Sequence, residues 1–573
     1  MSNKIKLTYG IFKEKISNKN LNIKGNIKIG WKVVFWFFII GILLFFISNI
    51  NFRFAKYGFN LFWENIGKFF NISNQSLLYG KQNLFALSFS FLFYSIKITF
   101  LGTAIGVILA FITSYFSNYK MVNKYIAGLF KIITTFLRIL PELIFIYIFS
   151  ISFDKTLAIT LILSWFTWLW LHEYFSQAIE NIDFSIFYHL TKIKKSKFMA
   201  FYEEIWPQIK MKFTNYIFYA FESNLRWNSI LSKLGFLGIG ILLNVPELGS
   251  QHYSNLFIPL FVLISFLFLL EIIHIGYTEL FLETKTLKIK TKEYEKNNLI
   301  KKVIKVLIFT LFITLIALSI KLLIGQKYYK IAGWQEFKNF FNPNWNDLHT
   351  KTYNDNNIFK IIIEFISLIT ISTIFTYIIS FLKLFFINNK INNKNISLFL
   401  KFINTFIRGV PIIVLFFIFN PIFIGNPISF VIAFSIHSAS SLVRNLENSI
   451  NKIDQQKINN LTKQGWSKWK IYNKFIVPTI KLDFITFITF EIEKITRNFI
   501  SYGIYASCLL GIKSTLSISR EMSDIASYLW IGVILIAITN LISYSIRYKV
   551  TNNYSFFNGF VSLFNKKRVI NPF

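Results

Sequence analysis

Long apolar runs alternate with short, mostly basic segments along the whole chain. A membrane-spanning helix needs about 20 apolar residues. Runs of this kind lie near residues 31–49, 86–116, 125–150, 155–172, 212–226 and 255–278, and again near 303–325, 357–387, 396–420, 427–443, 482–500 and 526–547. With each run counted as one span, the pattern predicts an all-α polytopic transmembrane bundle of about 12 spans.

The second half of the chain repeats the first at a separation of 271 residues. Leu190, Thr191, Lys192, Ser196, Lys197, Ile205, Pro207, Ile209 and Lys210 recur as Leu461, Thr462, Lys463, Ser467, Lys468, Ile476, Pro478, Ile480 and Lys481. The same register pairs Asp183 with Asp454, Glu222 with Glu493, Arg226 with Arg497 and Gly240 with Gly511. An even number of spans per repeat predicts two homologous halves in parallel orientation, related by an axis along the membrane normal.

Loop charge predicts the orientation and the domain limits. Lysines crowd the tail 1–30 and the linker 279–302, and the tail 549–573 is also basic, so the positive-inside rule places these segments in the cytoplasm. Both termini and both repeated loops, 183–211 and 454–481, are then cytoplasmic. The two transmembrane repeats are expected to span residues 31–278 and 303–548.

Composition narrows the function classes. With 54% hydrophobic residues, the chain has far more apolar sequence than one soluble core holds, and the topology explains the net charge of +35 without nucleic acid. Cys508 is the single cysteine, and the 6 histidines lack metal-ligand spacing. The segment from Gly511 to Thr515 is not a phosphate loop, because the required glycines are missing. We therefore expect a transport subunit rather than an enzyme, with no cofactor and no metal in this chain.

The repeated loops resemble the cytoplasmic loop of permeases of bacterial ABC importers. The second copy has Gly465 followed thirteen residues later by Pro478, as that family's loop does, whereas the first copy has Lys194 in place of the glycine. Tyr188-His189-Leu190 and Asn459-Asn460-Leu461 replace the usual Glu-Ala-Ala triplet.

Segments near the loops resemble the phosphonate-type permeases, including the fused mycoplasmal members of a high-affinity transport system. These segments are Ala178 to Asp183, Pro207-Gln208, Phe221 to Arg226, Leu234 to Gly240, and Arg138 to Glu142, with weaker counterparts Arg408 to Pro411 and Glu493 to Arg497.

The resemblance implies a set of partners and a mechanism. The partners would be two copies of an ABC ATPase subunit, which carries ATP and magnesium, and an extracytoplasmic binding protein or lipoprotein. The location would be a bacterial cell membrane and the mechanism alternating access. The solute would be a phosphonate or another organophosphate, with a phosphorylated vitamin such as thiamine diphosphate as the alternative.

The repeated loops are the predicted coupling elements. The residues assigned to them are Leu190, Thr191, Lys192, Ser196, Lys197, Ile205, Pro207, Leu461, Thr462, Lys463, Gly465, Ser467, Lys468, Ile476 and Pro478. Phe198, Phe201 and Ile205, with the aligned Trp469, Tyr472 and Ile476, would present an apolar stripe to a partner's groove, and each proline would end the helix before the next span. A helical loop lying on anionic lipid headgroups explains the lysines equally well.

Ionisable residues within the spans are the candidates for the translocation pathway. They are Arg138, Glu222, Arg226, Arg408, Glu493 and Arg497. Glu222 and Arg226 have the spacing of a helical ion pair, as have Glu493 and Arg497, so these residues either form self-neutralised pairs or line a path that favours an anion.

Two other classes remain open. A secondary transporter would use a carboxylate in the path that no arginine satisfies, and Glu142, Glu271 and Glu364 are the candidates. A membrane scaffold protein would use the loops for partners without any solute path.

Overall fold

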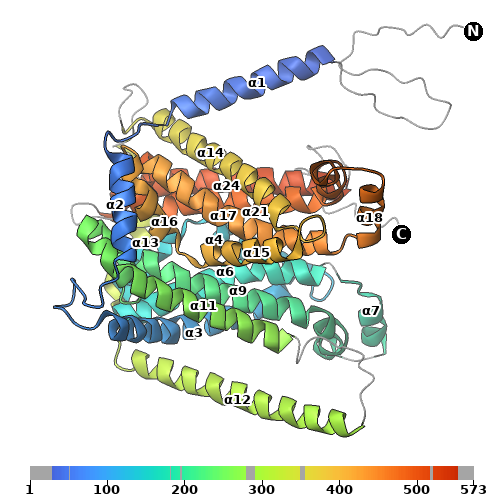
Figure 1. Ribbon diagram of the computed structural model, residues 1–573. Helices are drawn as coiled ribbons and strands as arrows, with labels where there is room; N and C mark the ends of the chain where they lie inside the picture. Colours follow the sequence, from blue (N-terminus) through green and yellow to red (C-terminus); the bar gives the residue numbers. More distant parts are fainter. Residues whose placement is uncertain are drawn as a thin grey trace, which may run out of the picture.

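The computed structural model is a bundle of long helices that run side by side, with short helices gathered at its two ends (Figure 1). It describes residues 29–50, 52–180, 182–193, 196–278, 291–346, 348, 355–506, 508–515 and 521–552. Most of both tails, and the first half of the linker, that loop charge assigned to the cytoplasm lie outside these ranges. Among the described residues there is no named strand, only isolated β-bridges.

The first half contains six long helical segments. They are α1 (Ile29–Ser48), α3 (Leu84–Phe116), the pair α4 (Lys124–Ile139) and α5 (Glu142–Ser152), α6 (Lys155–Glu180), α9 (Trp206–Lys233) and α11 (Phe257–Tyr277). Shorter helices are α2 (Gly58–Phe70), α7 (Ser185–Lys192), α8 (Lys197–Ala200), α10 (Gly240–Leu243) and the 3-10 turns η2 (Val245–Leu248) and η3 (Ser250–Asn255).

The second half repeats this order. Its long segments are α12 (Thr291–Leu323), α14 (Ile358–Ile387), the pair α15 (Lys394–Gly409) and α16 (Ile412–Phe419), α17 (Asn426–Asn451), α21 (Lys481–Ser501) and α24 (Met522–Asn552). Shorter helices are α13 (Lys330–Phe341), η5 (Asn420–Ile422), α18 (Gln455–Lys463), α19 (Lys468–Ile471), α20 (Val477–Thr479), α22 (Gly503–Ala506) and α23 (Leu509–Lys513). Helix α12 begins within the predicted linker 279–302, at Thr291.

The helical class is confirmed, and the predicted spans each fall on a helix or a bent pair. By length and hydropathy, 6 of the helices in the described part could cross a membrane, or up to 8 if each bent pair counts as one span. The four remaining predicted spans correspond to α1, α6, α9 and α21, which have 20, 26, 28 and 21 residues. The number of spans thus stays a prediction for these four.

Two of the predicted spans are not straight helices. The runs 125–150 and 396–420 each break at a proline, Pro141 or Pro411, with bends of 87° and 95°. The residue before a proline is pushed out of the α region. Leu140 and Val410 accordingly adopt extended backbone, with ψ of 131° and 126°. Each of these two runs is therefore a bent helix pair, and whether the pair forms one span stays a prediction. Each break places an arginine, Arg138 or Arg408, in the last turn before it.

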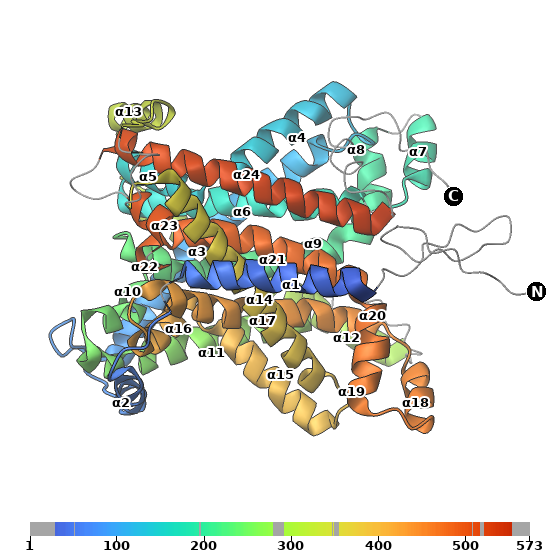
Figure 2. The same ribbon diagram turned by 90° about the horizontal axis from the view of Figure 1, so that it is seen from above.

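The two halves exchange their first elements. Helix α1 of the first half packs on α14 of the second, and α12 packs on α3. The short helices behave in the same way, since α2 contacts α16 and α13 contacts α5. Figure 2 shows α1 lying across the second-half helices. One apolar core therefore extends through both halves, with a smaller separate core beneath each repeated loop.

Different short elements lie at the two ends of the bundle. The N-terminal end of α1, the repeated elements around α7 and α18, and the C-terminal end of α24 gather at one end, and α2 and α13 lie at the other (Figure 1). Loop charge likewise places the two termini and both repeated loops on one side of the membrane.

Candidate functional site

Both repeated loops fold into the same series of short helices. In the first loop α7 and α8 run into a π-helical turn, η1 (Phe201–Ile205), and in the second α18 and α19 run into η6 (Tyr472–Ile476). Ser196 caps α8 by accepting a bond from the Met199 N–H at 3.2 Å, and Ser467 caps α19 through the Lys470 N–H at 3.3 Å. The repeated serine is therefore an N-cap in both copies.

The repeated aspartate also has a structural role. Asp183 accepts from the Ser185 N–H at 3.0 Å and Asp454 from the Gln456 N–H at 2.9 Å, which satisfies a free donor at the start of α7 and α18. Hydrogen bonds from the backbone and hydroxyl of Ser185 hold the pKa of Asp183 below its usual value.

The π-helical turns explain the repeated prolines. A proline inside a helix has no N–H and its ring clashes with the carbonyl four residues back. The wider π turn avoids this, with the Trp206 N–H bonded to the Phe201 carbonyl and the Val477 N–H to that of Tyr472. The expectation that each proline ends the helix was wrong for Pro207, where η1 passes directly into α9. At Pro478 the helical path also continues, through α20 into α21.

The predicted apolar stripe is largely turned inward. Phe201, Ile205, Tyr472 and Ile476 are buried in the small cores under the two loops, and the Tyr472 hydroxyl donates to the Phe381 carbonyl at 2.7 Å. These four side chains cannot enter a partner's groove, which corrects the interpretation of the stripe. These side chains instead attach each loop to the helices of its own half, because they lie on the helix face that packs against those helices.

Most other residues assigned to coupling are accessible. The exposed ones are Lys192, Ser196, Lys197, Pro207, Thr462, Lys463, Gly465, Ser467, Lys468 and Pro478. Leu190, Thr191 and Leu461 are half-buried. Gly465 has φ +76°, and the Trp466 N–H bonds to the Leu461 carbonyl at 3.2 Å, so the glycine ends α18 in a Schellman motif. Its counterpart Lys194 lies outside the described residues.

The repeated glycines after α9 and α21, Gly240 and Gly511, are required by close packing of the backbone. A Cβ on Gly240 would lie 2.3 Å from the Asn228 carbonyl oxygen, and one on Gly511 would lie 2.4 Å from the Gly503 Cα. Both positions are close backbone approaches that only glycine allows.

The predicted pathway arginines lie in ion-pair clusters between the halves. In the first cluster, Arg138 on α4 pairs with Glu173 on α6 at 2.8 Å and with Glu493 on α21 at 3.1 Å. Glu493 also pairs with Arg547 on α24 at 2.8 Å. We call these four residues the Arg138 cluster.

The second cluster occupies the matching place in the other half. Arg408 on α15 lies 3.5 Å from Glu222 on α9 and 3.2 Å from Glu271 on α11. Glu271 also pairs with Arg444 on α17 at 3.1 Å. We call these four residues the Arg408 cluster.

The two clusters share one rule. The arginine that precedes the helix break in one half pairs with the glutamate that follows the coupling element in the other half: Arg138 with Glu493, and Arg408 with Glu222. As defined, each cluster has two arginines and two glutamates, and Arg226 adds a third arginine beside Glu222 at 3.7 Å in the Arg408 cluster. Pairing with opposite charges is how ionisable side chains are usually held within a membrane protein.

Only part of the predicted helical pairing is present. Glu222 and Arg226 lie 3.7 Å apart, but Glu493 and Arg497 form no ion pair in the structure, because Glu493 turns to Arg138 and Arg547 instead. Arg226 also donates from Nη1 to the carbonyl of Arg408, which the helix end at Gly409 leaves without an intrahelical donor. The Nε and Nη2 atoms of Arg497 are buried with no hydrogen-bond partner in the described part of the chain.

Three cluster members were not among the residues predicted for the pathway. They are Glu173, Arg444 and Arg547. Glu173 and Arg444 stand at the same 271-residue separation but have opposite charges, so a search for identical residues does not connect them. Glu271 was considered as an unpaired carboxylate, and its ion pairs with Arg408 and Arg444 exclude that.

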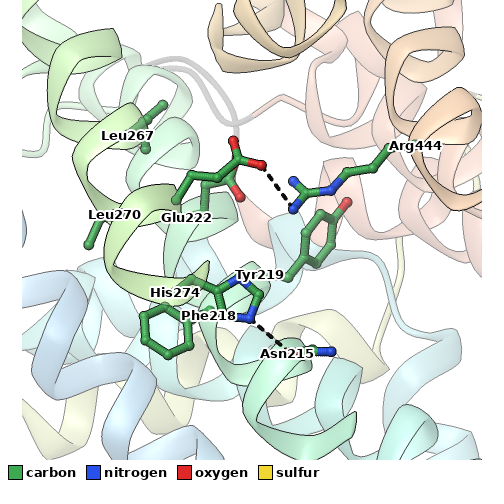
Figure 3. Close-up of a pocket in the computed structure, with 9 residues that line it drawn as sticks. Asn215, Phe218, Tyr219, Glu222, Leu267, Leu270, His274 and Arg444 are labelled. Carbon is green, nitrogen blue, oxygen red and sulfur yellow. Dashed lines mark hydrogen bonds and ion pairs between the residues drawn. The ribbon is translucent and has the colours of Figure 1, made fainter. Parts of the chain in front are cut away.

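A small pocket opens beside the Arg408 cluster, between α9 and α11 (Figure 3). It is lined by Asn215, Phe218, Tyr219, Glu222, Leu267, Leu270, Glu271, His274 and Arg444. His274 lies 2.8 Å from the side-chain oxygen of Asn215. No group of three or more potential metal ligands occurs among the residues that the structure describes.

Comparisons with known proteins agree with this architecture. Residues 385–553 match the family described as "Binding-protein-dependent transport system inner membrane component". The chain is 28% identical to the ABC transport system permease protein p69 of Mycoplasma genitalium over 506 residues, 86% of this chain and 90% of the relative. It is 27% identical to the protein of the same name from Mycoplasma pneumoniae over 434 residues, 74% of this chain and 78% of the relative. No solved structure matches the chain.

These findings indicate a class of protein. The chain is similar to permeases of ABC transport systems, and the part that matches the family model extends from the end of α14 to the end of α24. It is a multi-pass membrane protein whose similarity to the p69 permeases extends through both repeats.

Proposed function

We propose that this chain alone forms both halves of the pore of an ABC importer. The observation that carries this proposal is the coupling element built twice at one end of the bundle, with the same caps and the same π turn in each copy. Two such elements suit two ATPase subunits, which would carry ATP and magnesium. An extracytoplasmic binding protein or lipoprotein would deliver the solute at the opposite end, and both termini would be cytoplasmic.

Continuity of the helical path supports a mechanism. Helix α9 follows η1 directly and carries Glu222 about 24 Å further on, from the rise of 1.5 Å per residue. Helix α21 carries Glu493 at the corresponding place. A displacement of the coupling elements would therefore reach the two ion-pair clusters, where the halves meet. Breaking and re-forming these pairs would accompany the alternating access of the path to the two sides.

The solute that we propose is an anion of the phosphonate or organophosphate type. Arg497 supports this, since two of its donor atoms are buried without a partner, and a guanidinium can bind two phosphoryl oxygens at once. A phosphorylated vitamin such as thiamine diphosphate has the same recognition chemistry and is the alternative solute.

The test is ATP-dependent uptake by the chain reconstituted with its ATPase and binding protein. Labelled phosphonates, organophosphates and thiamine diphosphate are offered in turn. We expect uptake of one phosphoryl anion, a loss of at least about tenfold in Arg497→Gln because a charged hydrogen bond is removed, and partial recovery in Arg497→Lys. Uptake that runs without ATP and follows an ion gradient would overturn the proposal in favour of a secondary transporter.

A further inference from the structure

The two coupling elements share a backbone but present different surfaces. We define the first coupling surface as the exposed side chains of residues 185–204 and the second as those of residues 456–475, which is the same stretch 271 residues later. The first contains six exposed large hydrophobic side chains, Ile186, Tyr188, Ile193, Phe198, Met199 and Tyr202. The second contains one, Trp469. Lys194 and Lys195 are left out because the structure does not describe them.

The difference holds position by position. Ile186 corresponds to Lys457, Met199 to Lys470 and Glu203 to Lys474. Tyr188 and Tyr202 correspond to Asn459 and Asn473, and Ile193 corresponds to Gln464. Since the caps and π turns coincide, these substitutions change the chemistry of the surface while the backbone keeps its shape.

The second surface is strongly basic. Lys457, Lys463, Lys468, Lys470 and Lys474 are all exposed, and none of them forms an ion pair with any residue that the structure describes. Lys470 lies over the Trp466 ring at 4.5 Å from its centre. Across the equal stretches 183–210 and 454–481 the formal charge is +2 in the first, from five lysines against three acidic residues, and +5 in the second, from six lysines against one.

We propose that the second coupling surface binds an acidic surface of its ATPase subunit, whereas the first binds an apolar one. The two ATPase positions on this permease are then chemically unequal. This inference rests on the proposed function, because it assumes that ATPase subunits occupy the coupling elements. We choose an acidic partner because the exposed lysines of the second surface have no ion-pair partner among the described residues, and an acidic surface would complement their charge.

Raising the salt concentration distinguishes a charged contact between permease and ATPase from an apolar one. Exposed charge pairs are screened as the Debye length falls from about 10 Å at 0.1 M to about 3 Å at 1 M salt. Apolar contacts are not weakened in this way. Rising salt should therefore release the ATPase from the second surface and leave the one on the first.

The experiment counts ATPase subunits on the full-length permease in lipid nanodiscs by native mass spectrometry, from 0.1 to 1 M ammonium acetate. We expect two subunits at low salt and one at high salt, with an affinity loss of at least about tenfold at one position only. The variant Lys457→Gln/Lys463→Gln/Lys470→Gln/Lys474→Gln should carry one salt-resistant subunit throughout. The matched variant Ile186→Ser/Phe198→Ser/Met199→Ser should carry one subunit that salt removes.

Both variants change exposed side chains only, so their thermal unfolding should match that of the unmodified chain, and this is measured alongside. Loss of both subunits at one salt concentration, or an equal effect of the two variants on both positions, would overturn the inference.

Repeating the count in zwitterionic and anionic nanodiscs tests the lipid explanation. If the lysine variant keeps both subunits and loses only a dependence on anionic lipid, the second surface binds headgroups and the inference is wrong. Failure of the unmodified chain to bind any ATPase would overturn the proposed function, and this inference with it.

Discussion

The Arg138 and Arg408 clusters occupy matching places in the two halves, yet they distribute charge differently. Position 173 in the first cluster is a glutamate, and its counterpart in the second is Arg444. The last helix of each repeat contributes the opposite sign, Arg547 from α24 to the first cluster and Glu271 from α11 to the second. The two halves therefore keep paired opposite charges at their contact but differ in which helix carries which charge, and Arg226 adds a further arginine to the Arg408 cluster only.

The largest expected effect comes from removing the most buried carboxylate. Glu493→Gln leaves Arg138 and Arg547 without their shared partner, and the Glu493 side chain is only 5% exposed. Breaking a buried pair in this way should lower the free energy of unfolding by about 3 to 5 kcal/mol. Thermal unfolding of the purified chain in detergent measures it.

The matched control is Glu180→Gln, which removes the Lys131 ion pair, whose two side chains are about half exposed. It should cost no more than about 1 kcal/mol. Equal effects of the two variants would show that the Arg138 cluster is solvated and does not hold the halves together.

Exchanging two charges in the Arg138 cluster tests whether its charge arrangement can be converted to that of the Arg408 cluster. Glu173→Arg combined with Arg547→Glu gives the first cluster the arrangement of the second. Each single change should destabilise the chain, because it places like charges together, and the double variant should recover about 0.5 to 3 kcal/mol of the summed loss. Unfolding of all four chains of the cycle measures this coupling. Purely additive losses would mean that the helices cannot exchange these charges.

A smaller effect is expected at the turn that ends α18. Gly465→Ala forces a side chain into the left-handed region at φ +76°, although no atom lies within 4 Å of the added Cβ. The cost should be about 1 to 2 kcal/mol. It should appear as faster hydrogen exchange in 455–476 but not in 185–205. Unchanged exchange would show that the backbone conformation is not held by the glycine.

The smallest effect tests the equivalence of the two coupling elements. Ser196→Ala and Ser467→Ala each remove an N-cap with bond lengths of 3.2 and 3.3 Å. Both should lower local stability by about 1 kcal/mol, measured by hydrogen exchange in α8 and α19. Clearly unequal losses would contradict the view that the backbone of the two elements is the same.

The helical class, the location of the long helices and the duplication could be predicted from the sequence alone. These follow from local properties: apolar runs of spanning length, lysines between them, and identical residues at one separation. It also identified the repeated serine and aspartate positions, whose hydrogen bonds to backbone N–H groups depend only on neighbours two or three residues away.

Only the tertiary structure decided which charges meet. Glu493 is four residues from Arg497, so sequence spacing favoured that pair, yet Glu493 contacts Arg138 and Arg547 because α4, α21 and α24 converge there. The bends at Pro141 and Pro411 follow closely after Arg138 and Arg408, and each of these arginines lies in its own cluster. The inward turn of Phe201 and Tyr472 was likewise decided by packing, since an amphipathic pattern shows that one face is apolar but not what covers it. Contacts between distant segments depend on how helices cross, and no local pattern encodes that directly.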